Sequence, residues 1–405
     1  MRPDTILRRL VLVLLITTPF ILFHKLWAHI FPKPVDLVLL QNIRDAEPPC
    51  RRCTAPPLQF ENLNKVEEQV VNITEKHQEH QFKIDPVPDD RERPEQKATT
   101  NNTANSDVID LKCIFDMLTK PWKRNETTFR HFRETLDALT NTREMIVLTK
   151  NNCKLNEEME YSVQSNIKYP VTEEIYDALP KTSPFARKSY GVCSIIGGSG
   201  IINNSGCGEQ IDKSDFVIRC NMPPLELHAK DAGRKTDVTT ANNVAVLGGR
   251  YSGLARKYDQ QRLLSDVQQY SGYLWVPIFS VKSGTMYTLR AYRAMKREPS
   301  EQIKMIFAHP KHQIDVQAFW EKVGIQSRAT TGAHMVASAI SLCEEVHLYG
   351  FWPFDHVPDG RNIDFHYYDD RKIDTWAHDL SKEFLTLAKL HEQGVIRMHV
   401  QKCTS

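Results

Sequence analysis

The sequence carries almost no excess of charge of either sign. Its 405 residues include 52 Lys and Arg against 50 Asp and Glu, which gives a net charge of +2. Nucleic-acid-binding domains usually present a strongly basic surface, because phosphate contacts dominate that kind of affinity. The charge balance therefore argues against a nucleic-acid partner. The sequence also has no visible internal repeat, so a repeat architecture is not expected.

The glycine segment after residue 196 lacks the residues that define the common nucleotide loops. An apolar run at 192–196 is followed by Gly197–Gly200, which predicts a buried strand and then a turn that can approach a phosphate closely. A dinucleotide fingerprint needs a third glycine where the chain has Asn203, and a Walker lysine is absent too. A nicotinamide-dependent oxidoreductase and a P-loop enzyme are thus disfavoured. A structural turn and a mononucleotide site of another kind both stay open.

The N-terminal segment lacks the small residues that signal-peptide cleavage requires. Arginines at positions 2, 8 and 9 precede an uncharged apolar run from Leu10 to Phe23, and weaker apolar character continues to Phe31. We interpret residues 10–31 as a signal anchor rather than a cleaved signal peptide. Residues 1–9 would then be a cytoplasmic tail, and the chain after about residue 32 would be lumenal. The short span suits a thin early-secretory membrane.

Residues 32–107 contain too little apolar sequence to build a core, which predicts a flexible lumenal stem. Cys50 and Cys53 have a spacing found in zinc and redox sites, but a disulfide in the stem is the favoured interpretation. The chain has nine cysteines, so at least one cannot pair within it. A disulfide between Cys113 and Cys153, which bracket a mainly helical segment, is left open. Four N-glycosylation sequons agree with a lumenal location: Asn72, Asn101, Asn125 and Asn203.

Residues 108–405 are predicted to form a single α/β domain with a mainly parallel sheet. From Tyr190 onward, short apolar runs alternate with helical patterns, which is typical of that architecture. In such a domain, ligands bind beyond the carboxyl ends of the strands. The expected strands are 192–196, 216–220, 273–279, 303–307, 346–351 and 395–400.

Three later segments contain residues suited to binding anions or moving protons. Thr330–Gly332 introduces an amphipathic helix, whose N-terminus is an anion site or, in the plainer interpretation, only a cap formed by Thr330. The strand after that helix ends near Gly350, beside the glycine segment if the two strands are neighbours. His366 lies in a loop, and His378 directly precedes a helix. A histidine there is more often a capping residue, but two histidines after two phosphate-friendly turns favour acid–base chemistry.

Together these segments resemble the four motifs of the animal sialyltransferases. Residues 193–240 are similar to the large motif, and residues 330–352 are similar to the small one. The segment His366–Asp369 resembles the third motif, and His378 with Glu383 resembles the very small one. The segments PWKRNETTF and YGFWPF and the last cysteine are most similar to the α2,8-sialyltransferase branch.

The resemblance implies a type II Golgi membrane enzyme with a Rossmann-like (GT-A variant) catalytic domain. Its reaction would be an inverting transfer of sialic acid from CMP-sialic acid, without a metal or other cofactor. The acceptor would be a terminal sialic acid of a glycolipid or glycoprotein, and the new linkage would be α2,8. A homodimer is compatible with the resemblance.

The resemblance also implies disulfide pairs and site residues. Cys193 would pair with Cys343 and Cys207 with Cys403, while Cys220 would remain a thiol. His378 would be the general base, and a protonatable His366 would stabilise the phosphate. The implied donor-binding residues are Gly198, Ser199, Asn221, Thr330, Thr331, Gly332, Trp352, Phe365 and His366.

One residue departs from the α2,8 pattern. That branch typically has asparagine where this chain has Gly198, so an amide contact to the donor is lost. Only a backbone contact, or the neighbouring Ser199, can replace it.

The charge of residues 159–190 bears on the product. Polysialylating members carry a strongly basic segment just before the large motif, whereas this segment is balanced. Addition of one or a few residues is therefore expected. The alternatives are a sialyltransferase of another linkage or acceptor, and a catalytically inactive lumenal glycan-binding relative.

Overall fold

A computed structural model describes residues 109–371 and 378–403. The predicted tail, anchor and stem at 1–9, 10–31 and 32–107 lie outside these ranges. So do four residues discussed above: Cys50, Cys53, Asn72 and Asn101. No helix within the described ranges is long and apolar enough to cross a membrane. The described residues from Leu111 onward belong to one compact unit.

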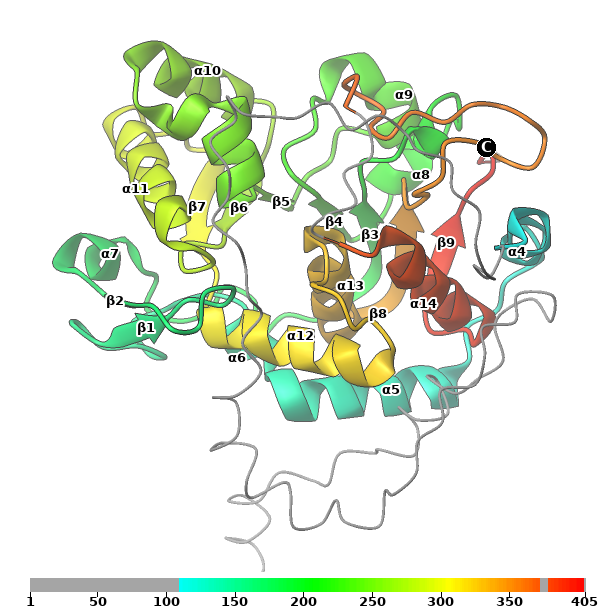
Figure 1. Cartoon of the computed structure of the whole chain (residues 1–405), viewed down its shortest axis with the longest axis horizontal. Helices are drawn as coiled ribbons and strands as arrows, with labels where there is room; N and C mark the ends of the chain where they lie inside the picture. Colours follow the sequence, from blue (N-terminus) through cyan, green and yellow to red (C-terminus); the bar gives the residue numbers. More distant parts are fainter. Residues whose placement is uncertain (1–108, 372–377, 404–405) are drawn as a thin grey trace, which may run out of the picture. The chain divides into compact units, whose positions relative to one another are not determined.

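A seven-stranded, fully parallel sheet lies at the centre of this unit, in the order β7-β6-β5-β4-β3-β8-β9 (Figure 1). Its strands are β3 (Tyr190–Ile196), β4 (Phe216–Arg219), β5 (Val238–Thr240), β6 (Gly272–Val276), β7 (Ile303–Phe307), β8 (Cys343–Tyr349) and β9 (Arg397–His399). The predicted mainly parallel α/β fold is confirmed. β5 was not predicted, because its three residues are too short for an apolar run. A separate antiparallel pair is formed by β1 (Glu158–Glu160) and β2 (Lys168–Pro170).

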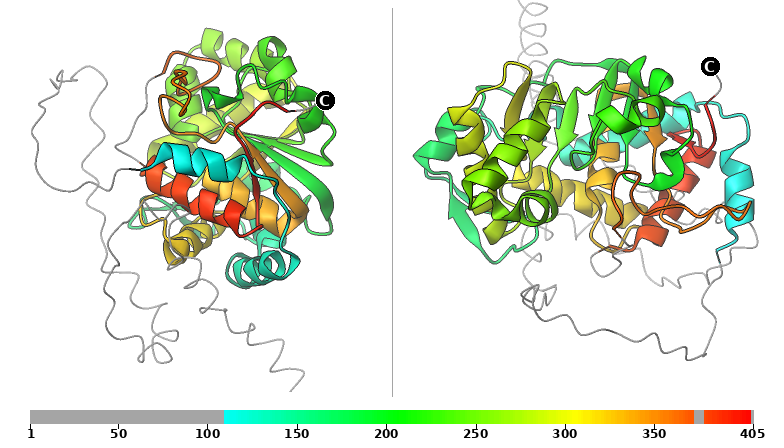
Figure 2. Two further views of the ribbon diagram at one scale, coloured as in Figure 1. Left: turned by 90° about the vertical axis from the view of Figure 1, so that its right-hand side faces the viewer. Right: turned by 90° about the horizontal axis from the view of Figure 1, so that it is seen from above.

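Helices cover both faces of the sheet. Figure 2 shows the sheet between a group that includes α5, α12 and α14 and the green helices α8, α9 and α10. Because both faces are covered, central strands are buried without alternation, as in all four residues of β4. The longer helices are α4 (Leu111–Leu118), α5 (Glu126–Thr140), α10 (Lys257–Val267), α11 (Lys282–Arg297), α12 (Pro310–Val323), α13 (Thr331–Leu342) and α14 (Leu380–Glu392). The shorter ones are α6 (Thr142–Met145), α7 (Glu173–Ala178), α8 (Gly208–Asp212), α9 (Ala229–Ala232), η1 (Gly200–Ile202), η2 (Glu226–His228), η3 (Asn243–Arg250) and η4 (Ser252–Leu254).

The order of the strands creates a switch point beside β3. The chain runs from β3 outward through β4 to β7, and then returns to place β8 on the other side of β3. Ile196 at the end of β3 pairs with Arg219 of β4 and with Tyr349 of β8, so these three strands end at the same level. The connections after β3 and β8 therefore leave the sheet in different directions. Open α/β sheets bind ligands at such a switch point, beyond the carboxyl ends of the strands.

Two disulfides confirm the pairing that the resemblance implied. Cys193 is bonded to Cys343, which joins β3 to β8, and Cys207 is bonded to Cys403 near the end of the chain. Cys220 is a buried free thiol, as expected.

The hypothesis of a bridge between Cys113 and Cys153 is wrong. Cys153 is a buried free thiol that donates to the carbonyl of Thr149, while Cys113 is disulfide-bonded to another cysteine. The two cysteines belong to different regions of the core. Cys153 packs in the cluster that includes Phe307 of β7, whereas α4, which carries Cys113, packs against α14.

Candidate active site

The loops after β3 and β8 are locked together by backbone hydrogen bonds. The amide of Gly197 donates to the carbonyl of Tyr349 at 2.8 Å, and the amide of Ser199 donates to that of Gly350 at 3.0 Å. A Cβ atom at Gly197 would lie 2.4 Å from the Gly350 oxygen, so glycine is required there. The predicted position of the β8 end beside the glycine segment is confirmed.

His366 occupies the space where a side chain at residue 198 would be. The amide of Tyr367 donates to the carbonyl of Gly198 at 2.8 Å, and a Cβ at Gly198 would lie 2.8 Å from Cδ2 of His366. An asparagine there would have to displace the imidazole. Gly198 can therefore offer a ligand only its backbone, while the hydroxyl of Ser199 accepts from the amide of Ile201.

The His366 ring is held by stacking and by a carboxylate. It stacks between the rings of Phe365 and Tyr368, at centroid distances of 4.6 Å and 4.8 Å. Its Nδ1 lies 2.7 Å from Oδ1 of Asp369, so Nδ1 carries the hydrogen and the Nε2 edge faces the glycine loop. Burial lowers the pKa of His366, and Asp369 acts in the opposite direction. Burial thus favours the neutral ring, and a nearby anion would favour the protonated one.

A buried carboxyl group, Glu383, organises the start of α13. Its Oε1 accepts from the hydroxyl of Thr330 at 2.6 Å and its Oε2 accepts from the amide of Thr330 at 2.9 Å. The Thr330 hydroxyl also caps the helix by accepting from the amide of Ala333. Burial raises the pKa of Glu383 to about 7, although the hydrogen bonds from Thr330 oppose that shift. Sequence reasoning did not place Glu383 in the site, because only its spacing from His378 was visible.

Glu383 accepts from both the hydroxyl and the amide of Thr330, so these two donors are not available to an anion at the start of α13. The amides of Thr331 and Gly332 belong to the first turn of α13, where N–H groups have no partner within the helix. Both residues were predicted to bind the donor. That role stays a prediction, and the geometry favours these two over Thr330.

His378 lies directly before α14 and is tied to the start of α13. Its Nδ1 lies 2.7 Å from the carbonyl oxygen of Arg328, and the amide of Asp379 donates to the hydroxyl of Ser327. Since a carbonyl can only accept, Nδ1 carries the hydrogen and the basic lone pair is on Nε2. This is the tautomer that a general base requires.

Phe351 connects the glycine loop with the start of α13. A Cβ at Gly197 would lie 3.1 Å from this ring, and a Cβ at Gly332 would lie 3.0 Å from it. Both glycines therefore press against the same aromatic side chain. Packing against Phe351 is therefore enough to require a small residue at both positions, whether or not a ligand binds there.

Trp352 is a core residue in this structure. Its side chain is 2% exposed, and it packs edge-on against Phe115 of α4 and Phe384 of α14. Its indole N–H donates to the carbonyl of His356. These contacts favour a role in positioning α14, and the predicted donor contact of Trp352 stays a prediction.

Asn221 follows β4 in the left-handed region, with φ of 64°. Its amide donates to the hydroxyl of Thr240, and its Oδ1 accepts from the amide of Asn242 at 3.2 Å. The predicted donor residue thus also connects the ends of β4 and β5.

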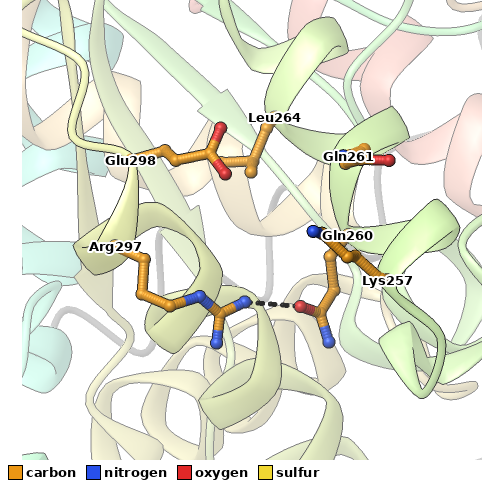
Figure 3. Close-up of a pocket in the computed structure, with 6 residues that line it drawn as sticks. All are labelled: Lys257, Gln260, Gln261, Leu264, Arg297 and Glu298. Carbon is orange, nitrogen blue, oxygen red and sulfur yellow. Dashed lines mark hydrogen bonds between the residues drawn. The ribbon is translucent and has the colours of Figure 1, made fainter.

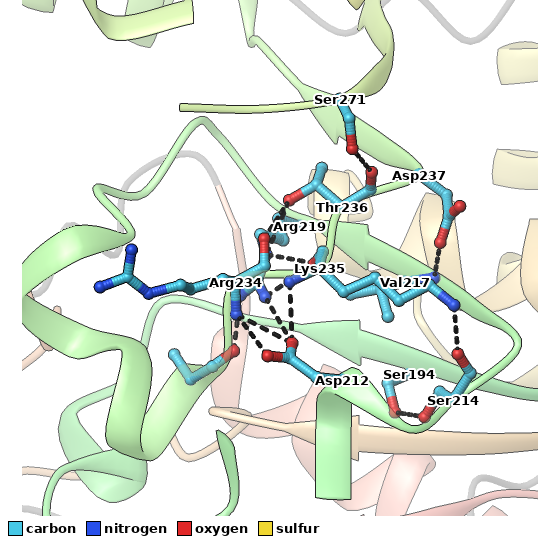
Figure 4. Close-up of polar contacts among 11 residues, drawn as sticks. Ser194, Asp212, Ser214, Val217, Arg219, Arg234, Lys235, Thr236, Asp237 and Ser271 are labelled. Carbon is cyan, nitrogen blue, oxygen red and sulfur yellow. Dashed lines mark hydrogen bonds and ion pairs between the residues drawn. The ribbon is translucent and has the colours of Figure 1, made fainter. Parts of the chain in front are cut away.

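Arg219, the last residue of β4, holds the segment that leads into β5 from inside the protein. Its fully buried guanidinium donates to the carbonyls of Ala232 and Lys235 and to the hydroxyl of Thr236 (Figure 4). Asp212 lies 3.8 Å away and accepts from the amides of residues 234 and 235. The network holds the segment before β5 against the end of β4.

A pocket away from the predicted site residues is also present in the described part of the chain. It has a volume of about 440 Å³ and lies between α10 and the end of α11 (Figure 3). Arg297 donates to Gln260 across it. Lys257 and Glu298 give it charges of both signs, and no predicted site residue contributes to its lining. We therefore place the candidate active site at the ends of β3, β4 and β8 and not here.

The fold and this site define a class of protein. Its members have a parallel α/β domain, and a glycine loop, a helix N-terminus and two histidines lie at the switch point of the sheet. Residues 147–395 match glycosyltransferase family 29 (sialyltransferase), and the chain belongs to this family.

Curated relatives agree with that assignment. An α-2,8-sialyltransferase 8F of Mus musculus is 31% identical over 354 residues, which are 86% of this chain and 85% of the relative. An α-N-acetylneuraminide α-2,8-sialyltransferase of Xenopus tropicalis is 36% identical over 285 residues, which are 70% of this chain and 81% of the relative. A solved structure of a mammalian sialyltransferase covers 72% of this chain and 95% of its own, at 20% identity and a TM-score of 0.38. That last likeness is weak, and the family assignment does not depend on it.

Proposed function

We propose that this sialyltransferase moves sialic acid from CMP-sialic acid to a terminal sialic acid of a glycolipid or glycoprotein glycan, with inversion and an α2,8 linkage. The names of the relatives support the linkage. The observation that carries the proposal is the position of His378. Its Nδ1 lies 2.7 Å from the carbonyl oxygen of Arg328, three residues before the start of α13, which supports a base of defined tautomer beside the proposed anion site.

The donor side of the reaction requires stabilisation of negative charge. The bond between the sialic acid carbon and the phosphate oxygen breaks, its electrons stay on the phosphate, and CMP leaves. Amides at the start of α13 and a protonated His366 would stabilise that charge in a partly buried site. Asp369 holds the other nitrogen of His366, so the ring presents its Nε2 edge. This set can neutralise the leaving phosphate without a metal.

The acceptor side requires removal of one proton. The acceptor hydroxyl attacks the anomeric carbon from the face opposite CMP, and its proton passes to Nε2 of His378. A histidine suits this step because its ordinary pKa is close to neutral. The carbonyl of Arg328 stabilises the imidazolium that forms, since Nδ1 already donates to it.

We propose a Golgi lumenal location for the catalytic domain, on the membrane anchor at residues 10–31. The two disulfides support an oxidising compartment. The sequon at Asn125 also supports it, because this residue is exposed. The proposal includes addition of one or a few sialic acids rather than long chains.

The test is incubation of the full-length protein with CMP-sialic acid and matched sialylated and desialylated acceptors, followed by linkage analysis of the products. We expect transfer to the sialylated acceptors alone, with α2,8 products. His378→Ala should abolish transfer while CMP binding persists, and His356→Ala, at an exposed histidine, should retain it. Transfer to desialylated acceptors would contradict the linkage. CMP binding without any transfer would indicate an inactive relative.

A further inference from the structure

Two arginines lie at the margin of the candidate site without a role in the mechanism above. The first is Arg250, the last residue of η3, which follows shortly after β5. Its Nη1 donates to the carbonyl of Met222 at 2.7 Å, and its guanidinium lies 5.6 Å from the ring of Tyr368. That ring stacks on His366. Arg250 is therefore fixed one side chain away from the proposed phosphate-stabilising histidine.

The second is Arg371, which reaches the same place from the loop after β8. Its amide donates to Oδ1 of Asp369, the same oxygen that accepts from His366. A Cβ at Gly249 would lie 3.7 Å from Nη2 of Arg371, so this guanidinium lies against the residue that precedes Arg250. Two segments far apart in the sequence thus bring two arginines to the same margin of the site.

Neither arginine is paired with an acidic side chain within the part of the chain that the structure describes. Across residues 109–371 and 378–403, no carboxylate lies within ion-pair distance of either guanidinium, and the nearby Asp369 already accepts from His366. Both arginines act on His366 and lower its pKa. Adjacent cations disfavour each other unless an anion is present. Their shared position favours an anionic ligand.

Resting on the proposed function, we infer that Arg250 and Arg371 bind the carboxylate of a sialic acid. A guanidinium matches a carboxylate through two parallel hydrogen bonds. The proposed function assigns the CMP phosphate to the start of α13, so a second anionic group fits the arginines. Both substrates of an α2,8 transfer supply one, because the donor and the acceptor each carry a sialic acid carboxylate. A carboxylate site of this kind would also explain selection of sialylated acceptors.

The primary variant is Arg371→Gln, because this side chain is exposed and its substitution leaves the fold intact. Arg250→Lys is the second variant, and Arg361→Gln, at an exposed arginine paired with Asp359, is the control. The KM of donor and acceptor is measured separately, together with the inhibition constant of CMP alone. Loss of one charge-assisted hydrogen bond predicts a rise of about tenfold in the KM of one substrate. CMP inhibition and the Arg361→Gln control should not change.

The arms of the experiment separate the sources of the carboxylate. A rise in acceptor KM assigns it to the acceptor, and a rise in donor KM alone assigns it to the donor. Weaker inhibition by CMP would show that the arginines bind the phosphate. Unchanged KM values and an unchanged CMP inhibition constant in both variants would show that the arginines bind neither group. Either result overturns the inference.

A binding measurement makes the test independent of turnover. Saturation-transfer NMR of the full-length protein with a methyl sialoside should show contact that is lost in its methyl ester and in Arg371→Gln. This result would stand even if no acceptor were sialylated, in which case only the proposed function fails. Equal contact by the acid and the ester, or no contact by either, overturns the inference.

Discussion

At the scale of single residues, Glu383 shows what a buried carboxyl group does to a site. Both of its oxygens accept from Thr330, which keeps those donors away from a ligand at the start of α13. Its carboxyl group has a pKa raised by burial, with Asp379 adding to the shift. An ionised Glu383 would repel a phosphate bound at the neighbouring amides, whereas a protonated one would not.

We expect Glu383 to make stability depend on pH. Burial raises its pKa from 4.5 to about 7, so between these values the folded chain binds more protons than the unfolded chain. Its contribution to stability is therefore complete at acid pH and is lost as the pH rises through about 7. Glu383→Gln stays neutral and lacks this dependence. The free energy of unfolding of the natural chain relative to Glu383→Gln should fall by about 3 kcal/mol between about pH 4 and about pH 8.

Urea unfolding over a series of pH values measures this difference. Glu134→Gln, at an exposed carboxyl on α5, is the matched control and should follow the natural chain throughout. Parallel pH profiles for the natural chain and Glu383→Gln would contradict a proton bound at this site.

At this scale the sequence predicted which residues belong to the candidate site, but it did not predict which of them contact one another. The motifs singled out His366 and His378, and the replaced asparagine was visible at Gly198. The reason for Gly198 was not visible, because the ring that fills its space comes from a segment about 170 residues further along the chain. The link between Glu383 and Thr330 was hidden for the same reason.

At the scale of elements, the connection between β4 and β5 depends on one buried arginine. The guanidinium of Arg219 satisfies acceptors on three residues from three separate nitrogens in one plane, a spread that the single nitrogen of a lysine does not have. Burial lowers the pKa of Arg219, a sign of the cost of placing this charge inside the protein. The contacts it makes there must offset that cost.

Arg219→Lys should therefore destabilise the protein. Lysine leaves at least two buried acceptors unsatisfied, at a cost of about 1–3 kcal/mol each, so we expect a loss of about 3 kcal/mol in the free energy of unfolding. The midpoint of denaturant unfolding measures this loss. Arg234→Lys is the control, because Figure 4 shows its guanidinium pointing away from the network. Equal midpoints for the two variants would mean that the network does not stabilise β4 and β5.

The elements themselves were largely predictable from the sequence. Long apolar runs and helical patterns located six of the seven strands of the sheet and the helix that begins after Thr330. β5 escaped because two of its three residues are threonines, whose burial comes from the sheet around them and not from their own polarity.

At the scale of the whole molecule, the order of the strands was beyond sequence patterns. A run of parallel strands is compatible with several orders, and only long-range packing places β8 next to β3. The disulfide between Cys193 and Cys343 joins these same two strands. The resemblance to the sialyltransferases supplied this pairing, whereas spacing alone had left Cys113 and Cys153 as an open pair.

The two bridges should make the activity sensitive to reduction. They span sequence separations of 150 and 196 residues, for which the chain-entropy account gives about 5 kcal/mol each. One holds β3 against β8 at the switch point, and the other holds the segment after the glycine loop to the end of the chain. We expect reductant to abolish sialic acid transfer by the full-length protein once mass spectrometry of alkylated peptides shows both bridges open. Cys153→Ala, which removes a free thiol, should be active and equally sensitive. Full transfer by a chain with both bridges open would mean that packing alone maintains the register of β3 and β8.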